Sequence, residues 1–140
     1  MGRAARAGAL GALAALAAVV LAGCFDVQSP DLFLLTRTGQ SAKLTLLVND
    51  SGTIRCNGGK AKPISNSSLI AARDLSDNLA GDAQNKLTIA TVPGSIYYFR
   101  IRLQQGTIAF PDKAAGRRQA LAQAELFAAQ AAQRECGLSG

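Results

Sequence analysis

The stretch "SIYYFRIRL", residues 95–103, decides the fold, because apolar and polar side chains alternate along it with a period of two. One side of such a strand would carry the residues of a core, namely Tyr97, Phe99, Ile101 and Leu103. The other side would carry Tyr98, Arg100 and Arg102. This alternation is typical of an antiparallel strand with one face on the core and the other in water. We therefore expect a sheet that is covered on one side only.

The residues after this strand predict a hairpin followed by a helix. The turn "QQG" leads into "TIAFPD", residues 107–112, where Ile108 and Phe110 continue the apolar face. An Ala/Gln-rich segment then predicts a helix from about Arg117 to Arg134. Its stripe toward the sheet would consist of Leu121, Ala124, Phe127 and Ala131.

The residues before this strand predict three further strands and a helix. β-rich runs at residues 32–38, 43–49 and 53–56 are separated by "GQSA" and by the turn sequence "NDSG". After a loop, residues 65–82 predict a helix that is capped by a serine or Asn66 and ends at Gly81. Its apolar stripe would be Leu69, Ala72, Leu75 and Leu79. Residues 86–90 predict a short strand before the turn at Pro93 and Gly94.

Together these elements predict an α+β domain: an antiparallel sheet of about five or six strands, in a ββ(β)α-ββα order, with two helices packed on one face. The letters "GTI" occur at residues 52–54 and again at 106–108, each time between a strand and a helix. Either duplication of a ββα unit or chance would explain this repeat.

The first 23 residues predict an export signal. Arg3 and Arg6 give a positive start, and residues 9–21 form an uncharged apolar core. The uncharged run extends from residue 7 to residue 25, so an uncleaved anchor is an alternative, although its Ala/Gly content makes it only weakly apolar.

At the end of this segment, Leu21, Ala22, Gly23 and Cys24 resemble the lipobox of bacterial lipoproteins at all four positions. The resemblance implies that a signal peptidase recognises the first three residues and that Cys24 carries lipid as the first residue of the mature protein. It also implies a tether at residues 24–31, a single domain at residues 32–140 and a place on the outer side of the cell membrane. The chain as a whole resembles small lipoproteins of actinobacteria. An unmodified cysteine in an ordinary signal is the alternative.

Cys56 and Cys136 remain once Cys24 is set aside. Outside the cytoplasm, an even pair of cysteines is most simply a disulfide. Two buried, unpaired thiols are the alternative.

The composition disfavours several classes of function. The 140 residues include no His and no Trp, and only 5% are aromatic, which disfavours imidazole catalysis, His-ligated metals and the stacking surfaces of nucleic-acid-binding proteins. The net charge is +6, from 15 basic and 9 acidic residues, and favours an anionic partner. Arg3 and Arg6 would leave with the signal, so the mature charge would be +4.

No catalytic or cofactor motif is complete. "CNGGK" lacks the remainder of a phosphate-binding loop. Ser65, Ser67 and Ser68 could act as nucleophiles only with a Lys as base, and serines at the start of a helix are ordinarily caps. The acidic residues Asp74, Asp77 and Asp82 lack the spacing of a calcium loop. We therefore expect no enzyme, no cofactor and no metal, with a Ser/Lys hydrolase as a remote alternative.

The polar side of the decisive strand is the candidate binding face. Tyr98, Arg100 and Arg102 could be joined there by Arg55, Lys60 and Lys62. An ordinary solvated sheet face is the alternative. We expect a membrane-anchored binding module of the cell envelope, whose partner is an anionic component or a protein and not a nucleic acid.

The order of elements from Leu32 onward, with "RTG" near the first strand and a Tyr-rich strand and hairpin before a final helix, weakly resembles the emfourin protease inhibitors. Where that family tends to have paired glycines, this chain has Gly39 and Gln40. The resemblance implies an inhibitor as an alternative function and assigns no inhibitory residues.

Overall fold

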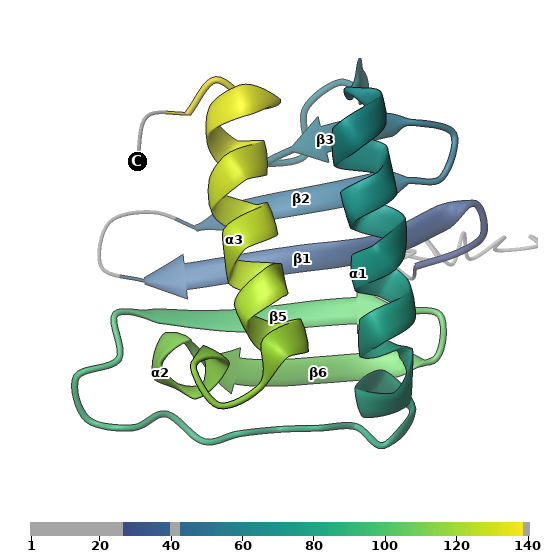
Figure 1. Ribbon diagram of the computed structural model, residues 1–140. Helices are drawn as coiled ribbons and strands as arrows, with labels where there is room; N and C mark the ends of the chain where they lie inside the picture. The colour runs from purple at the N-terminus through teal and green to yellow at the C-terminus, as the bar shows by residue number, and fades with distance from the viewer. Residues whose placement is uncertain (1–26, 40–42, 139–140) are drawn as a thin grey trace, which may run out of the picture.

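The computed structural model describes residues 27–39 and 43–138. Within these residues, six strands form one sheet in the order β4-β3-β2-β1-β5-β6, and all neighbouring strands are antiparallel. Figure 1 labels all of these strands except β4. The strands are β1 (Asp31–Gly39), β2 (Leu44–Asn49), β3 (Thr53–Cys56), β4 (Lys62–Pro63), β5 (Tyr97–Leu103) and β6 (Gly106–Pro111). The helices are α1 (Asn66–Gln84), α2 (Asp112–Ala115) and α3 (Gln119–Arg134). This is the α+β fold that the sequence predicts.

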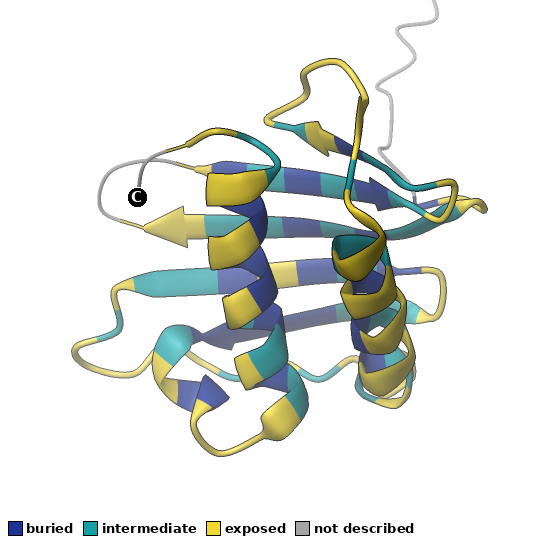
Figure 2. Cartoon of the chain, turned by 45° about the horizontal axis from the view of Figure 1, so that its top comes forward, coloured by how far each residue is buried: buried dark blue, intermediate teal, exposed yellow. Residues whose placement is uncertain are grey.

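Helices α1 and α3 run side by side across the same face of the sheet (Figure 1). The buried residues of both helices face the strands, whereas their outer sides are exposed (Figure 2). Aromatic contacts tie the two layers and the strands together: the rings of Phe33 and Phe127 meet edge to face at 5.5 Å, and those of Phe99 and Phe110 stack at 5.2 Å. Burial of each such side chain contributes about 1.5–3 kcal/mol.

Strand β5 holds the place that its alternation predicts. It pairs with β1 on one side and with β6 on the other. Phe99, Ile101 and Leu103 are buried, Tyr97 is half-buried, and Arg100 is exposed. The period-two pattern therefore identifies both the strand and the face that the helices cover.

Helix α1 begins as predicted and ends later. The Ser65 hydroxyl accepts a hydrogen bond from the Ser68 N–H at 3.1 Å, which makes Ser65 the N-cap. The predicted end at Gly81 is wrong, because the helix continues to Gln84 and thereby buries Ala83. The left-handed residue beyond the helix is Lys86, with φ 53°. Of the predicted stripe, Ala72, Leu75 and Leu79 are buried and Leu69 is half-buried.

Helix α3 confirms its predicted stripe, since Leu121, Ala124, Phe127 and Ala131 are all buried. It starts at Gln119, two residues later than predicted. The short helix α2 before it was not predicted, because four residues are too few to show a helical period. Residues 27–39 and 43–138 therefore contain three helices where the sequence predicts two.

Two segments of the sheet also differ from the prediction. The predicted loop after Cys56 contains the two-residue strand β4, at the edge of the sheet, where a proline is tolerated. Residues 86–90, predicted as a strand, make a single parallel bridge between Thr88 and Ala109 of β6. The chain then bends away at the turn in which the Ser95 N–H donates to the Val92 carbonyl.

The domain begins earlier than predicted. Val27 is buried, and the Asp50 N–H donates to the Pro30 carbonyl at 2.8 Å. Asp31 already belongs to β1, and its carboxylate accepts a hydrogen bond from the Asn49 side chain at 2.9 Å. The second half of the predicted tether, from Val27 onward, is thus packed on the domain.

Candidate functional site

The face of the sheet away from the helices carries the predicted binding residues. On β5, Ile101 points to the core, so Tyr98, Arg100 and Arg102 point to the opposite side. Arg100 is exposed, whereas Tyr98 and Arg102 are half-buried. The Tyr98 hydroxyl donates to the Ile89 carbonyl at 3.3 Å, so it helps to hold the 86–95 segment against the sheet.

The strand register places two leucines and a further arginine in one row with Arg102 across the sheet. Arg55 of β3 lies opposite Leu47 of β2, Leu47 opposite Leu34 of β1, and Leu34 opposite Arg102. With strands about 4.8 Å apart, Arg55 and Arg102 stand about 14 Å from each other across two half-buried leucines. We call the set Arg55, Leu47, Leu34, Arg100 and Arg102 the open face.

Of the basic residues that were predicted to join this face, Arg55 lies on it and Lys62 does not. Lys62 pairs with Ile54, whose side chain is buried in the core, so Lys62 lies on the helix side of β4. Lys60 precedes β4 in an exposed loop. Leu34 and Leu47 were missed, although their alternation with the buried Phe33, Leu35, Leu46 and Val48 was visible in the sequence.

The serines at the start of α1 form a capping cluster. The Ser65 and Ser67 hydroxyls lie 3.1 Å apart, and the Ser68 hydroxyl donates to Glu135 at 2.6 Å. Close by, Cys56 and Cys136 form the predicted disulfide, with Cα atoms 5.9 Å apart. The hydrogen bonds of Ser65 and Ser68 therefore serve to join the start of α1 to the end of α3.

The acidic residues of α1 do not converge. Asp82 forms an ion pair with Arg118 at 2.8 Å, while Asp74 and Asp77 are exposed. In the part of the chain that the structure describes, no group of three His, Cys, Asp or Glu side chains could hold a metal ion.

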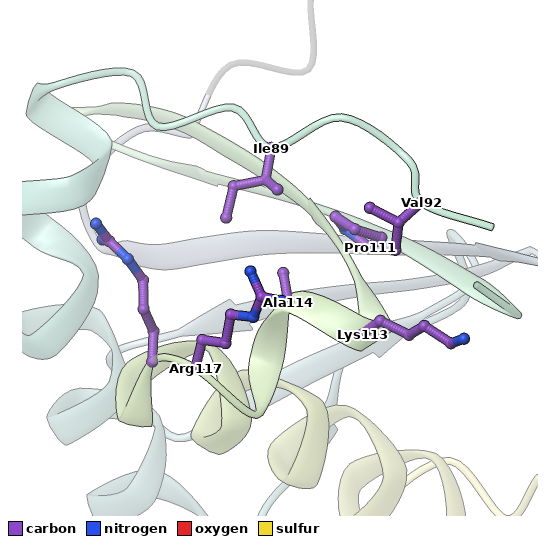
Figure 3. Close-up of a pocket in the computed structure, with 7 residues that line it drawn as sticks. Ile89, Val92, Pro111, Lys113, Ala114 and Arg117 are labelled. Carbon is purple, nitrogen blue, oxygen red and sulfur yellow. The ribbon is translucent and has the colours of Figure 1, made fainter. Parts of the chain in front are cut away.

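A hollow of about 460 Å³ lies between the 86–95 segment and helix α2 (Figure 3). Its apolar wall consists of Ile89, Val92, Pro111 and Ala114, and its basic residues are Lys113, Arg117 and Arg118. None of these seven residues is acidic. In Figure 3 Ile89 and Val92 face Ala114 and the side chain of Arg117 across the hollow. The sequence does not predict this site.

Two carboxyl groups with shifted pKa values lie at the base of α2 and on α3. Burial alone would raise the pKa of Asp112, but its carboxylate accepts hydrogen bonds from the N–H groups of Ile96 at 3.0 Å, Tyr97 at 3.2 Å and Lys113 at 2.8 Å. The net effect lowers the pKa of Asp112. Burial, and then the charge of Asp112, raise the pKa of Glu125.

The lipobox residues Leu21, Ala22, Gly23 and Cys24 lie outside the described residues. Within residues 27–39 and 43–138, no helix has the length and apolar character needed to cross a membrane.

Comparison with family models, with curated proteins and with solved structures gave no match. The resemblances to bacterial lipoproteins and to emfourin-like inhibitors therefore stay predictions from the sequence.

Proposed function

We propose that the chain is a lipid-anchored binding module of the cell envelope, which displays its open face to an anionic partner on the outer side of the membrane. The observation that carries the proposal is the row across four strands, in which Arg55 and Arg102 flank Leu34 and Leu47 on the face that α1 and α3 leave uncovered. A sheet surface on which two leucines lie between two cationic side chains suits an extended acidic partner.

The anchor supports the same function, because it would keep the domain near the lipid surface. The buried Val27 is the third residue after Cys24, and this spacing corresponds to at most about 10 Å of extended chain. Two or more acyl chains on Cys24 would hold the domain on the membrane essentially permanently.

The anchor is tested by membrane fractionation of the native protein and of a Cys24→Ala variant. We expect the native protein to sediment with membranes as an acylated form that starts at Cys24, and the variant to be soluble or to remain uncleaved. A native N-terminal peptide that contains intact Gly23 and Cys24 with a bare thiol would contradict the proposal.

The open face is tested by retention of the full chain on immobilised polyglutamate. Arg100→Glu should elute at clearly lower salt than the native chain, because an exposed cation in the binding face is reversed. Lys62→Glu is the matched control, since it changes the net charge equally from the helix side of the sheet. If both variants shift equally, net charge alone governs retention and the open face is not the binding surface.

A further inference from the structure

We propose that the hollow beside α2 binds a small anionic amphiphile, namely an organic carboxylate with a short hydrocarbon chain. The site is formed by the 86–95 segment, the end of β6, α2 and the start of α3. It shares no residue with the open face.

Among the described residues, the basic side chains of the hollow leave one cation, that of Arg117, available for a ligand. The Lys113 ammonium donates to the Pro93 carbonyl at 3.1 Å, and Arg118 is paired with Asp82 at 2.8 Å. Arg117 is exposed, and within residues 27–39 and 43–138 its side chain makes no ion pair or hydrogen bond. A guanidinium group is the side chain best suited to a two-point contact with a carboxylate.

Two carboxylates near the hollow, Asp112 and Asp82, are engaged by other groups and form no ion pair with Arg117 among the described residues. Asp112 lies next to the hollow in the sequence, but its carboxylate is held by the backbone N–H groups of Ile96 and Tyr97. Asp82 is engaged with Arg118. The charge of the hollow is therefore positive and favours an anionic ligand.

The position of the arginines adds to this preference. Arg118 is the N-cap of α3, it makes no capping hydrogen bond through its side chain, and Arg117 precedes it. The positive end of a helix dipole disfavours cations and favours anions. These two arginines thus occupy positions that do not serve the stability of the helix, and their field adds to that of the helix.

The opposite wall gives the ligand its apolar part. Val92 is 40% exposed and Ile89 is half-buried, and the buried Pro111 and Ala114 complete the apolar lining. A volume of about 460 Å³ lies within the usual range of about 300–1,000 Å³ for small-molecule sites. A carboxylate on Arg117 would leave its hydrocarbon chain against Ile89 and Val92.

The proposal is tested by amide chemical shifts of the ¹⁵N-labelled full chain, held in a nanodisc of zwitterionic lipid, during titration with hexanoate. We expect saturable shifts at Ile89, Val92 and Ala114. Hexanol, which lacks the charge, and propionate, which lacks most of the chain, should each bind about tenfold more weakly or worse.

Arg117→Gln should weaken hexanoate binding by about tenfold or more, whereas Lys60→Gln, which removes the same charge from an exposed loop, should leave it unchanged. Equal binding of hexanol would reveal a merely apolar hollow, and equal binding of propionate a simple anion site; either result overturns the proposal. It is also overturned if the shifts lie elsewhere, or if Arg117→Gln binds like the native chain.

Discussion

The disulfide between Cys56 and Cys136 joins the end of β3 to the residues just after α3, across a sequence separation of 80. Strand β3 pairs with β2 on one side and only with the two-residue β4 on the other. The covalent link therefore fixes this edge of the sheet to helix α3. That helix is otherwise held by packing and by the Asn78 side-chain amide, which donates to Gln123 at 3.0 Å. The Ser68 hydrogen bond to Glu135 adds α1 to the same junction.

Removal of this link should cost much of the stability of the domain. For a closed loop of about 80 residues, the loss of the constraint on the unfolded chain corresponds to about 4 kcal/mol. We expect Cys56→Ala/Cys136→Ala to lower the free energy of unfolding in urea by about this amount. Cys24→Ala, which leaves the pair intact, is the control. A loss below about 1 kcal/mol would show that the disulfide does not stabilise the fold.

Gly106→Ala should be strongly destabilising, because an added Cβ would overlap the backbone carbonyl of Ala83 at the end of α1. The φ of 153° at Gly106 adds backbone strain for any other residue. We expect a loss of about 3 kcal/mol or more in the free energy of unfolding. Gly58→Ala is the control, since its φ is 73° but its Cβ would meet nothing within 4 Å. It should cost about 1–2 kcal/mol, and equal losses would refute the role of the contact.

The sequence predicts those parts of the fold whose signal is a periodic side-chain pattern within one segment of the chain. The alternation in β5 and the stripe of α3 are periodic, so side chains such as Ile101 and Phe127 could be assigned to the core from the sequence. Lys62 could not be placed, because its face depends on the register that the preceding loop sets. The hollow lined by Ile89, Val92 and Arg117 could not be predicted either. Its walls are positioned by a single β-bridge and by the four-residue helix α2, and neither produces a periodic pattern in the sequence.

Glu125→Gln should stabilise the fold at neutral pH. The pKa of Glu125 is raised in the folded chain above its ordinary value of 4.5, through burial and then the charge of Asp112. Between 4.5 and the raised pKa, the folded chain binds more protons than the unfolded chain, so this group makes stability fall as pH rises. The stability gain of the variant should therefore be absent below pH 4.5 and grow above it.

Urea unfolding of both chains at a series of pH values measures this difference. The control is Asp77→Asn, which removes an exposed carboxylate from α1. A gain that is the same at all pH values would mean that Glu125→Gln acts through packing and not through ionisation.

Arg117→Glu should stabilise the fold and abolish hexanoate binding together. Arg117 lies just before the N-cap of α3, where the helix dipole favours a negative charge by about 0.3–1 kcal/mol at low salt. The same substitution replaces the available cation of the hollow by a carboxylate, which would repel the anionic ligand. Thermal unfolding should therefore show a higher Tm, and this gain should shrink as salt is added.

Arg134→Glu is the control at the other end of α3, where the dipole has the opposite sign. It should lower the Tm and leave hexanoate binding intact. If Arg117→Glu lowers the Tm while binding is lost, Arg117 supports the local structure. The hypothesis that Arg117 binds the ligand at the expense of helix stability would then be wrong.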